Sequence, residues 1–458
     1  MAGAKRAAQI AGRIAQEVIE QGWPVGESLG FEPELRERFH VSRMVFREAV
    51  RILEHQQVVR TRRGPRGGVF VTEPTVQAVI DTVVLYLYRI DATADEVIEA
   101  LIVLEQIACD LATSRLDEHG IERLREVIAD TDSSPRRSTR AFHTLVASLS
   151  GNSALELFID VLNRVLVLYA RDWRKTSDGN GDGRDHIAIA RALMDHDAAL
   201  ARRRVRNHLQ AARKQLPDTA KTLRWRGAFR TSADSKLSEE VARGISDVMM
   251  RRRLQPGDLI GGEEELIEGT RVSRDVFREA VRLLEHQRIA EMRRGHGGGL
   301  FVVEPSIAPV AEITAIYLAW VGMDIGELSD LRTELETATV MLAAERISDA
   351  GRSRLRDALD REMAAGDVPS SDALHDLHTA IAAVAANRVL ELIALVLILL
   401  TRLYGVDRVS ADLRKELLAE VQNSHHGIAT AVEEGDRVLA RSRMRAHLEA
   451  IATLMRKS

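Results

Sequence analysis

The sequence is poor in several residue types, and each shortage excludes a class of protein. It holds one cysteine, Cys109, so no intramolecular disulfide and no thiolate zinc cluster can form. The longest apolar run, from Leu392 to Leu400, is shorter than half of the roughly 20 residues that a membrane-spanning helix needs. The first residues also lack the apolar segment of a signal peptide. We therefore expect a cytoplasmic protein that neither enters a membrane nor is secreted.

An excess of positive charge is also missing. The formal net charge is -4, with 64 basic against 68 acidic side chains, so any surface that binds nucleic acid must be local. Aromatic residues make up only 4% of the chain, whereas helix-forming alanine, leucine, arginine and glutamate are abundant. This composition predicts a mainly α-helical fold.

The chain contains an internal repeat. The segment VSRMVFREAVRILEHQ at residues 41–56 recurs as VSRDVFREAVRLLEHQ at residues 272–287, a shift of 231 positions. Later segments around His143 and His378 also align, with small insertions. The whole chain is therefore a duplication.

The first seventy or so residues of each copy have the pattern of a small mixed domain. In copy 1 a first helix ends at Gly22, a second is expected at 33–39, and Ser42 can cap a third at 43–55. Two short β-type runs follow, joined by a basic, glycine-rich hairpin at 63–68. This order is typical of a winged helix-turn-helix domain.

The rest of each copy consists of long segments with helical periodicity. We therefore predict a mainly α fold with two winged helix-turn-helix domains that carry small β-wings, and two all-helical antiparallel bundle domains. The expected boundaries are 1–73 and 74–213 for copy 1, 214–236 for a linker, and 237–304 and 305–458 for copy 2.

The third helix of each copy has an arginine-bearing face. An apolar stripe that includes Val45, Ala49 and Leu53 would face the core, while Arg43 and Arg47 could reach guanine O6 and N7 with a planar guanidinium fork. A solvated surface arginine without a partner is the alternative. This helix and the glycine-rich hairpin resemble the winged helix of GntR-type bacterial transcription regulators, and the rest of each copy resembles the FadR-type C-terminal helical ligand-binding domain.

The exposed face and the resemblance together imply contacts with a double-stranded DNA operator. The residues concerned are Ser42, Arg43, Met44, Arg47, Arg66, Gly67, Gly68, Ser273, Arg274, Asp275, Arg278, His296, Gly298 and Gly299. One departure from the family is that Pro33 and Glu264 stand where some members carry a basic residue near the start of the second helix.

The two winged domains differ in charge. Residues 5–72 hold 12 basic and 8 acidic side chains, whereas residues 236–303 hold 12 of each. Asp275 also replaces Met44 beside the leading arginine, which repels phosphate but could accept a hydrogen bond from cytosine N4. We therefore expect an imperfect palindrome with two different half-sites.

Three histidines in each helical domain could converge on one point: His143, His186 and His208 in copy 1, and His378, His425 and His447 in copy 2. His186 and His208 lie 11 residues on either side of Asp197, and if Asp197 caps a helix after a tight turn, antiparallel helices bring the two together. Neutral imidazoles suit zinc, nickel and related divalent ions, while hydrogen-bonded core histidines are the alternative.

The resemblance adds two expectations about the helical domains. Many family members have an aspartate four residues before the first histidine, where this chain has Thr139 and Leu374. The family also often has an arginine that pairs with an organic-acid effector, and that place holds Arg332 in copy 2 but Leu101 in copy 1. We expect copy 2 to be the better carboxylate sensor, although Arg332 in a plain salt bridge is an equal alternative.

These features predict a bacterial, nucleoid-associated transcription regulator and not an enzyme. The chain would act as a covalent pseudo-dimer that binds one operator with both winged domains. The resemblance implies that it is a repressor. An organic or fatty acid and a divalent metal, bound in the helical domains, would control its affinity for the operator. Two such chains could pair to give a homodimer. A metal-dependent hydrolase that uses the three-histidine sites, and an architectural DNA-binding protein without an effector, are the alternatives.

Overall fold

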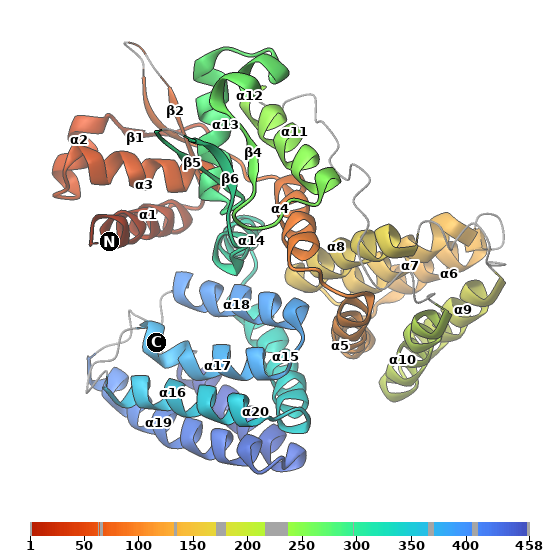
Figure 1. The fold of residues 1–458 in the computed structure, drawn as a ribbon. Coiled ribbons are helices and arrows are strands. Elements are labelled where there is room, and N and C mark those ends of the chain that lie inside the picture. Colours follow the sequence, from red (N-terminus) through yellow and green to blue (C-terminus); the bar gives the residue numbers. More distant parts are fainter. Residues whose placement is uncertain are drawn as a thin grey trace. The chain divides into compact units, whose positions relative to one another are not determined.

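The computed structural model describes residues 2–458 except 63, 65–66, 132–134, 171–179, 216–236, 296, 365–370, 405–410 and 456–458. These residues are mainly helical and form two three-stranded antiparallel sheets (Figure 1), which confirms the predicted fold class. The chain divides into two compact units, residues 1–90 with 224–320 and residues 91–223 with 321–458. The first unit contains two winged domains, named head 1 (2–72) and head 2 (237–303), and the second contains the helical domains.

Head 1 has the element order of a winged helix-turn-helix: α1 Ala2–Glu20, β1 Ser28–Gly30, α2 Glu32–Arg38, α3 Arg43–His55, β2 Val59–Arg62 and β3 Gly68–Val71. The Ser42 hydroxyl accepts a hydrogen bond from the backbone N–H of Val45 at 3.4 Å, which confirms the predicted cap of α3. Buried Phe46, Ala49 and Leu53 hold α3 in the core of the head, where it packs on α1. Strand β1, which our sequence analysis did not predict, completes a sheet of order β1-β3-β2.

Head 2 repeats this order: α11 Leu237–Arg252, β4 Leu259–Gly261, α12 Glu263–Thr270, α13 Arg274–His286, β5 Ala290–Arg293 and β6 Gly299–Val302. Its sheet has the equivalent order β4-β6-β5. Ser273 caps α13 through the N–H of Val276 at 3.4 Å, as Ser42 caps α3. Met249, Phe277 and Leu284 lie in one buried core. The duplication of the sequence is therefore a duplication of this fold.

The helix that follows each head packs with the heads. Helices α4 (Val76–Arg89) and α14 (Ile307–Trp320) contact each other within the first unit. Leu85 of α4 belongs to the apolar core of head 2, and the Arg89 guanidinium donates to the backbone oxygens of Arg288, at 2.7 Å, and Val303. Burial lowers the pKa of Arg89 to about 10. The boundaries that we predict from the sequence, after residues 73 and 304, place both helices with the helical domains, whereas here they belong to the unit that contains the heads.

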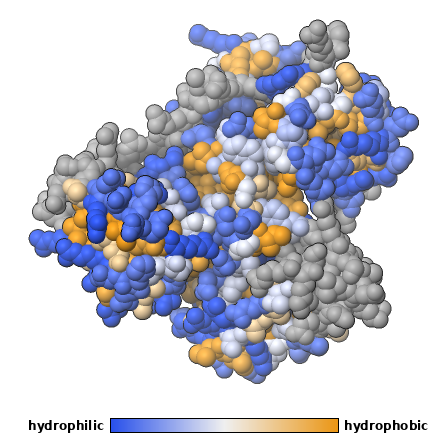
Figure 2. Space-filling view, turned by 180° about the vertical axis from the view of Figure 1, so that it is seen from behind, coloured by the Kyte–Doolittle hydropathy of each residue, from blue (hydrophilic) through white to orange (hydrophobic). Residues whose placement is uncertain are grey.

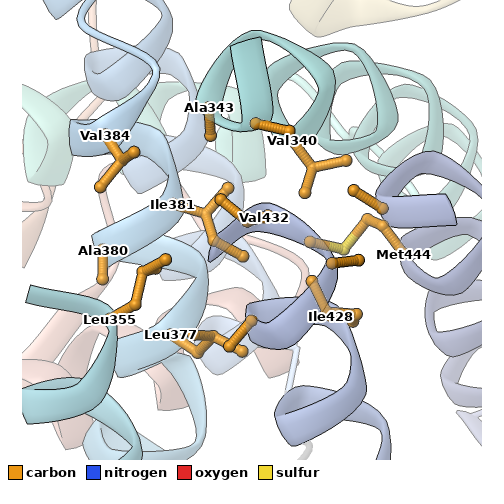
Figure 3. Close-up of a cluster of buried hydrophobic side chains, with 14 of the residues drawn as sticks. Val340, Ala343, Leu355, Leu377, Ala380, Ile381, Val384, Ile428, Val432 and Met444 are labelled. Atoms are coloured by element: carbon orange, nitrogen blue, oxygen red, sulfur yellow. The ribbon is translucent and has the colours of Figure 1, made fainter. Parts of the chain in front are cut away.

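Among its described residues, the second unit contains six helices from each copy. Copy 1 contributes α5 Ala94–Arg115, α6 Glu118–Thr131, α7 Pro135–Leu149, α8 Ser153–Ala170, α9 Asn180–Met194 and α10 Ala198–Gln215. Copy 2 contributes α15 Ile325–Glu345, α16 Asp349–Ala364, α17 Ser371–Val384, α18 Arg388–Leu403, α19 Ala411–Glu433 and α20 Arg437–Met455. In the core of copy 2, Val340 of α15, Ile381 of α17 and Met444 of α20 meet (Figure 3).

The two helical domains meet through contacts that occur twice with the copies exchanged. Arg346 of copy 2 donates to Glu99 of copy 1 at 3.1 Å, and Arg115 of copy 1 donates to Asp330 of copy 2 at 2.8 Å. The shift of 231 positions relates Arg115 to Arg346 and Glu99 to Asp330, so these are equivalent pairs. Such exchanged pairs are the pattern of a two-fold interface.

The two-fold pattern is not exact. The Glu96 carboxylate accepts hydrogen bonds from the backbone N–H of Arg388 at 3.1 Å and from its Nε at 2.7 Å. Burial alone would raise the pKa of Glu96, but the hydrogen bonds from Arg388 and from the N–H of Thr93 outweigh it and lower the pKa to about 2. In the equivalent contact Glu327 accepts the backbone N–H of Ser153 at 2.7 Å. The two halves of the interface are therefore not chemically identical.

Candidate nucleic-acid interface and metal centres

The predicted reading residues of head 1 lie on an open face of α3. Ser42, Arg43, Met44 and Arg47 are all exposed, and the side chain of Met44 is 77% exposed. The Nε atoms of Arg43 and Arg47 lie 3.0 and 3.2 Å from the two carboxylate oxygens of Glu32, the first residue of α2. Head 1 thus presents two guanidinium groups, fixed by one carboxylate, beside an apolar side chain.

The equivalent face of head 2 is also open but carries different chemistry. Ser273, Arg274, Asp275 and Arg278 are exposed on α13. The Nε of Arg278 lies 3.7 Å from Glu263, which is a looser ion pair than those in head 1. Asp275 adds a negative charge in the first turn of the helix. Both helices have the exposure that reading a groove requires.

The glycines of each predicted wing lie at its base. Gly68 pairs with Arg62 in the sheet, and a Cβ on Gly68 would lie 3.0 Å from the backbone oxygen of Gly30. The backbone N–H groups of Gly67 and Gly298 close turns onto Gly64 and Gly295.

A Cβ on Gly299 would lie 2.8 Å from the backbone oxygen of Gly261. This close packing explains Gly68 and Gly299 without DNA, and contact of the wing glycines with DNA stays a prediction. Arg66 and His296 lie outside the described residues.

The wing strands show a charge difference that our sequence analysis missed. In head 1, Arg60 and Arg62 are exposed on β2, and the Arg62 guanidinium lies 4.3 Å from the Phe70 ring centroid. In head 2, Glu291 occupies the place of Arg60 and pairs with Arg293 at 2.7 Å. The shift of 231 positions could have revealed this exchange, because it aligns Arg60 with Glu291 directly.

The predicted convergence of three histidines is confirmed in copy 2. His378 of α17, His425 of α19 and His447 of α20 are buried, and their Nε2 atoms lie 3.2, 3.2 and 3.3 Å apart. Three nitrogens bound tetrahedrally at about 2.0–2.1 Å from one ion would lie roughly 3.3–3.4 Å apart. The triangle therefore has the size of one face of a tetrahedral zinc site.

Buried carboxylates orient two of these rings. The Nδ1 of His425 lies 2.8 Å from Glu362, and the Nδ1 of His378 contacts Glu336. A carboxylate on the far nitrogen fixes the tautomer and turns the other nitrogen toward a metal. The role of Glu362 was missed in our sequence analysis, because it lies on α16, away from every histidine in the sequence.

Copy 1 brings its three histidines together in nearly the same arrangement. The ring centroids of His143, His186 and His208 are 5.1, 5.4 and 4.8 Å apart, against 5.0, 5.3 and 4.7 Å in copy 2. His143 contacts Glu105 at 2.7 Å. Among the residues that the structure describes, neither ring nitrogen of His186 has a hydrogen-bond partner, and Phe142 stacks on the ring at 4.6 Å.

In each cluster, burial favours the neutral form of at least one imidazole, which is the form that binds a metal ion. Burial, followed by the neighbouring imidazoles, lowers the pKa of His186 to about 2 and that of His447 far below its usual value. Burial also lowers the pKa of His425, although its bond to Glu362 acts the other way. A buried imidazole without a partner is costly unless a ligand satisfies it. The side chains of Thr139 and Leu374 lie outside the described residues.

Arg332 lies between a cavity and the copy 2 cluster. Its Nε donates to Glu336 at 2.6 Å and its Nη1 to Thr401 at 3.2 Å, and Glu336 in turn contacts His378. Burial alone would raise the pKa of Glu336, but the charges of His378 and Arg332 lower it strongly. Arg332 also lines a cavity of about 230 Å³ with Thr401 and Leu448. The salt bridge that is the alternative to an effector role, between Arg332 and Glu336, is present. Its arginine also lines a cavity.

Comparison with known proteins agrees with this architecture. Residues 6–71 match the family described as "Bacterial regulatory proteins, gntR family", and residues 96–211 and 327–450, together more than half of the chain, match the FCD domain. The chain is 26% identical to the HTH-type transcriptional regulator LutR of Bacillus subtilis over 209 residues, which are 44% of this chain and 93% of LutR. It is also 26% identical to the Uxu operon transcriptional regulator of Escherichia coli over 231 residues, 45% of this chain and 85% of that one.

Among solved structures, Streptococcus agalactiae GntR is 22% identical, with a TM-score of 0.34, and the match covers 45% of this chain and 99% of that one. Each of these matches covers less than half of this chain.

The fold, the exposed reading helix and the matches define a DNA-binding transcription regulator. The chain belongs to the GntR family and carries a winged helix-turn-helix at its N-terminal end and two FCD domains. Its relatives are transcription regulators and not enzymes, which answers the hydrolase alternative. Within the described residues, none of the helices is long and apolar enough to cross a membrane. On the face shown in Figure 2, apolar areas alternate with hydrophilic ones.

Proposed function

We propose that one chain binds one operator with both heads, so that the duplication replaces the usual pairing of two chains. The observation that carries this proposal is the set of exchanged contacts between the two helical domains, Arg115 with Asp330 and Arg346 with Glu99. The packing of α4 on head 2 adds support, because Leu85 and Arg89 tie the helix after head 1 to the other head. Two heads on one polypeptide bind neighbouring half-sites with high avidity, because the second contact is intramolecular.

The two heads recognise different half-sites of an imperfect palindrome. Head 1 has Met44 and Arg60 where head 2 has Asp275 and Glu291. Positive charge on the wing strand favours phosphate contacts by head 1, while a carboxylate in the first turn of α13 disfavours phosphate and can accept from cytosine N4. Head 1 therefore supplies most of the affinity for the phosphate backbone of the DNA.

The helical domains bind a divalent metal and a small organic acid that changes operator affinity. Zinc or nickel fits the histidine clusters, with an open position that an anionic ligand can take. In copy 2 the path from the cavity to the cluster runs through Arg332, Glu336 and His378. A guanidinium has five N–H donors, so Arg332 can hold Glu336 and also bind a carboxylate. Ligand binding in this domain relieves repression, as is usual in the family.

Arg332→Leu, which installs the residue of copy 1, is expected to weaken carboxylate binding by about 10- to 100-fold, because a charge-assisted hydrogen bond contributes roughly 1.5–3 kcal/mol. Calorimetry of the zinc-loaded chain with a panel of organic acids measures this loss. Arg441→Leu, which removes an exposed arginine on α20, should leave the affinity unchanged. Equal acid binding by Arg332→Leu and the wild type would disprove the sensor role.

An architectural DNA-binding protein without an effector is the competing function. In that case the cavity beside Arg332 would be a packing defect, and operator affinity would be the same with and without every acid of the panel.

Pairing of two chains into a homodimer with four heads stays a prediction, and light scattering of the free protein measures it.

A further inference from the structure

Glu32 contacts both arginines at the exposed start of α3 in head 1, Arg43 and Arg47. It is the first residue of α2, and its two carboxylate oxygens accept separate hydrogen bonds, one from Arg43 and one from Arg47. The arginine side chains are 63% and 52% exposed, whereas that of Glu32 is 31% exposed. One half-buried carboxylate thus fixes two exposed guanidinium groups that would otherwise move freely.

The geometry leaves the reading ends of both guanidinium groups usable. Each arginine bonds to Glu32 through Nε, while an end-on fork to guanine O6 and N7 uses the two Nη groups. The two arginines are one helical turn apart, which is a rise of about 6 Å along α3. That rise is close to two base-pair steps of about 3.4 Å each. The pair therefore has the spacing to read two bases within one half-site.

Head 2 provides a natural comparison, because the equivalent carboxylate does not hold its arginines in this way. Glu263 corresponds to Glu32 at the shift of 231 positions, and the Nε of Arg278 lies 3.7 Å from it, beyond hydrogen-bond distance. The exposed fraction of the Arg278 side chain, 56%, is similar to that of Arg47. The difference between the heads is the carboxylate contact rather than the exposure of the arginine.

We propose that Glu32 is a positioning residue for DNA reading by head 1, an inference that rests on the DNA-binding role of this head. Its carboxylate holds Arg43 and Arg47 in the conformation that meets base edges, so less side-chain entropy is lost on specific binding. The same negative charge opposes the use of these arginines as general phosphate contacts. Glu32 thus raises the ratio of specific to non-specific affinity instead of the total affinity.

The test uses the intact chain and two duplexes of equal length, the operator selected from random DNA and a random-sequence duplex. Glu32→Gln keeps the shape of the side chain and removes its charge. It is expected to tighten binding to the random duplex, to steepen its salt dependence, and to lower the specificity ratio about tenfold, within the range that one well-placed arginine contributes. Glu263→Gln, the matched change in head 2, should lower the ratio less than about threefold.

The outcomes separate this inference from the function on which it rests. A wild-type chain that fails to distinguish the two duplexes would overturn the DNA-reading role itself and the inference with it. A wild type that discriminates, together with an unchanged ratio in Glu32→Gln or equal losses in both variants, would overturn the positioning role alone. Equal loss of affinity for both duplexes would show that Glu32 only supports the fold.

Discussion

Replacing Arg47 and Arg278 by alanine in the same chain is expected to weaken operator binding severely. Each arginine that reads a guanine contributes roughly 1–3 kcal/mol, so the double change weakens binding by about 30-fold to about 20,000-fold. The two arginines sit at equivalent, exposed positions of α3 and α13. Mobility shifts with the selected operator at fixed salt measure the loss.

The single variants sharpen this prediction. Arg47→Ala should cost more than Arg278→Ala, because the Nε of Arg47 is held by Glu32 at 3.2 Å while that of Arg278 lies 3.7 Å from Glu263. Arg441→Ala, on the exposed side of α20, removes the same charge away from the heads and should change nothing. Wild-type affinity in the double variant would mean that these helices do not read DNA.

Replacing His425 by alanine is expected to lower the zinc content of the chain from the two ions that we propose to one. His425 is one of the three histidines of the copy 2 cluster, and its Nε2 lies 3.2 Å from both other Nε2 atoms. Loss of a residue that only hydrogen-bonds to a metal ligand lowers metal affinity by about 10- to 100-fold. Loss of one of the three histidines should lower the affinity for zinc by more than that. Metal analysis after dialysis against a weak chelator measures the stoichiometry.

Thermal unfolding gives an independent measurement of the same site. Zinc at one hundred times its dissociation constant stabilises a folded domain by about 2.7 kcal/mol, so the zinc-induced rise in Tm should shrink in His425→Ala relative to its own metal-free state. His426→Ala changes the next residue, which is exposed, and is the matched control. Two zinc ions in His425→Ala, or the same loss in His426→Ala, would contradict the copy 2 site.

Much of this architecture follows from local sequence patterns. Ser42 and Ser273 predict where α3 and α13 begin, because a serine hydroxyl caps the N–H groups that a helix start leaves free. Asp197 fixes the turn that brings His186 and His208 within 4.8 Å between ring centroids, so their spacing in the sequence predicts their meeting in space. In these cases the cause and the effect are close in the sequence, within a few residues for the caps and 11 residues for the histidines.

The features that the sequence did not reveal depend on distant partners. Leu85 looks like part of the helical domain until its place in the core of head 2 is known, and the residues it contacts there are more than 150 positions away. Glu362 reaches His425 from another helix, and no spacing rule links the two. Glu32 is likewise one glutamate among several in α2, and only the fold brings it to both arginines.

The central claim is that the two heads of one chain occupy the two halves of one operator. The most direct measurement compares the selected operator with a version that carries five extra base pairs between the half-sites, by titration and by the mass of the complex. Five base pairs rotate one half-site by about half a helical turn. We predict one chain per operator and a loss of about 100-fold or more, the avidity of a tethered second head, on insertion. Two chains per operator, or an affinity that the insertion leaves unchanged, would contradict the claim.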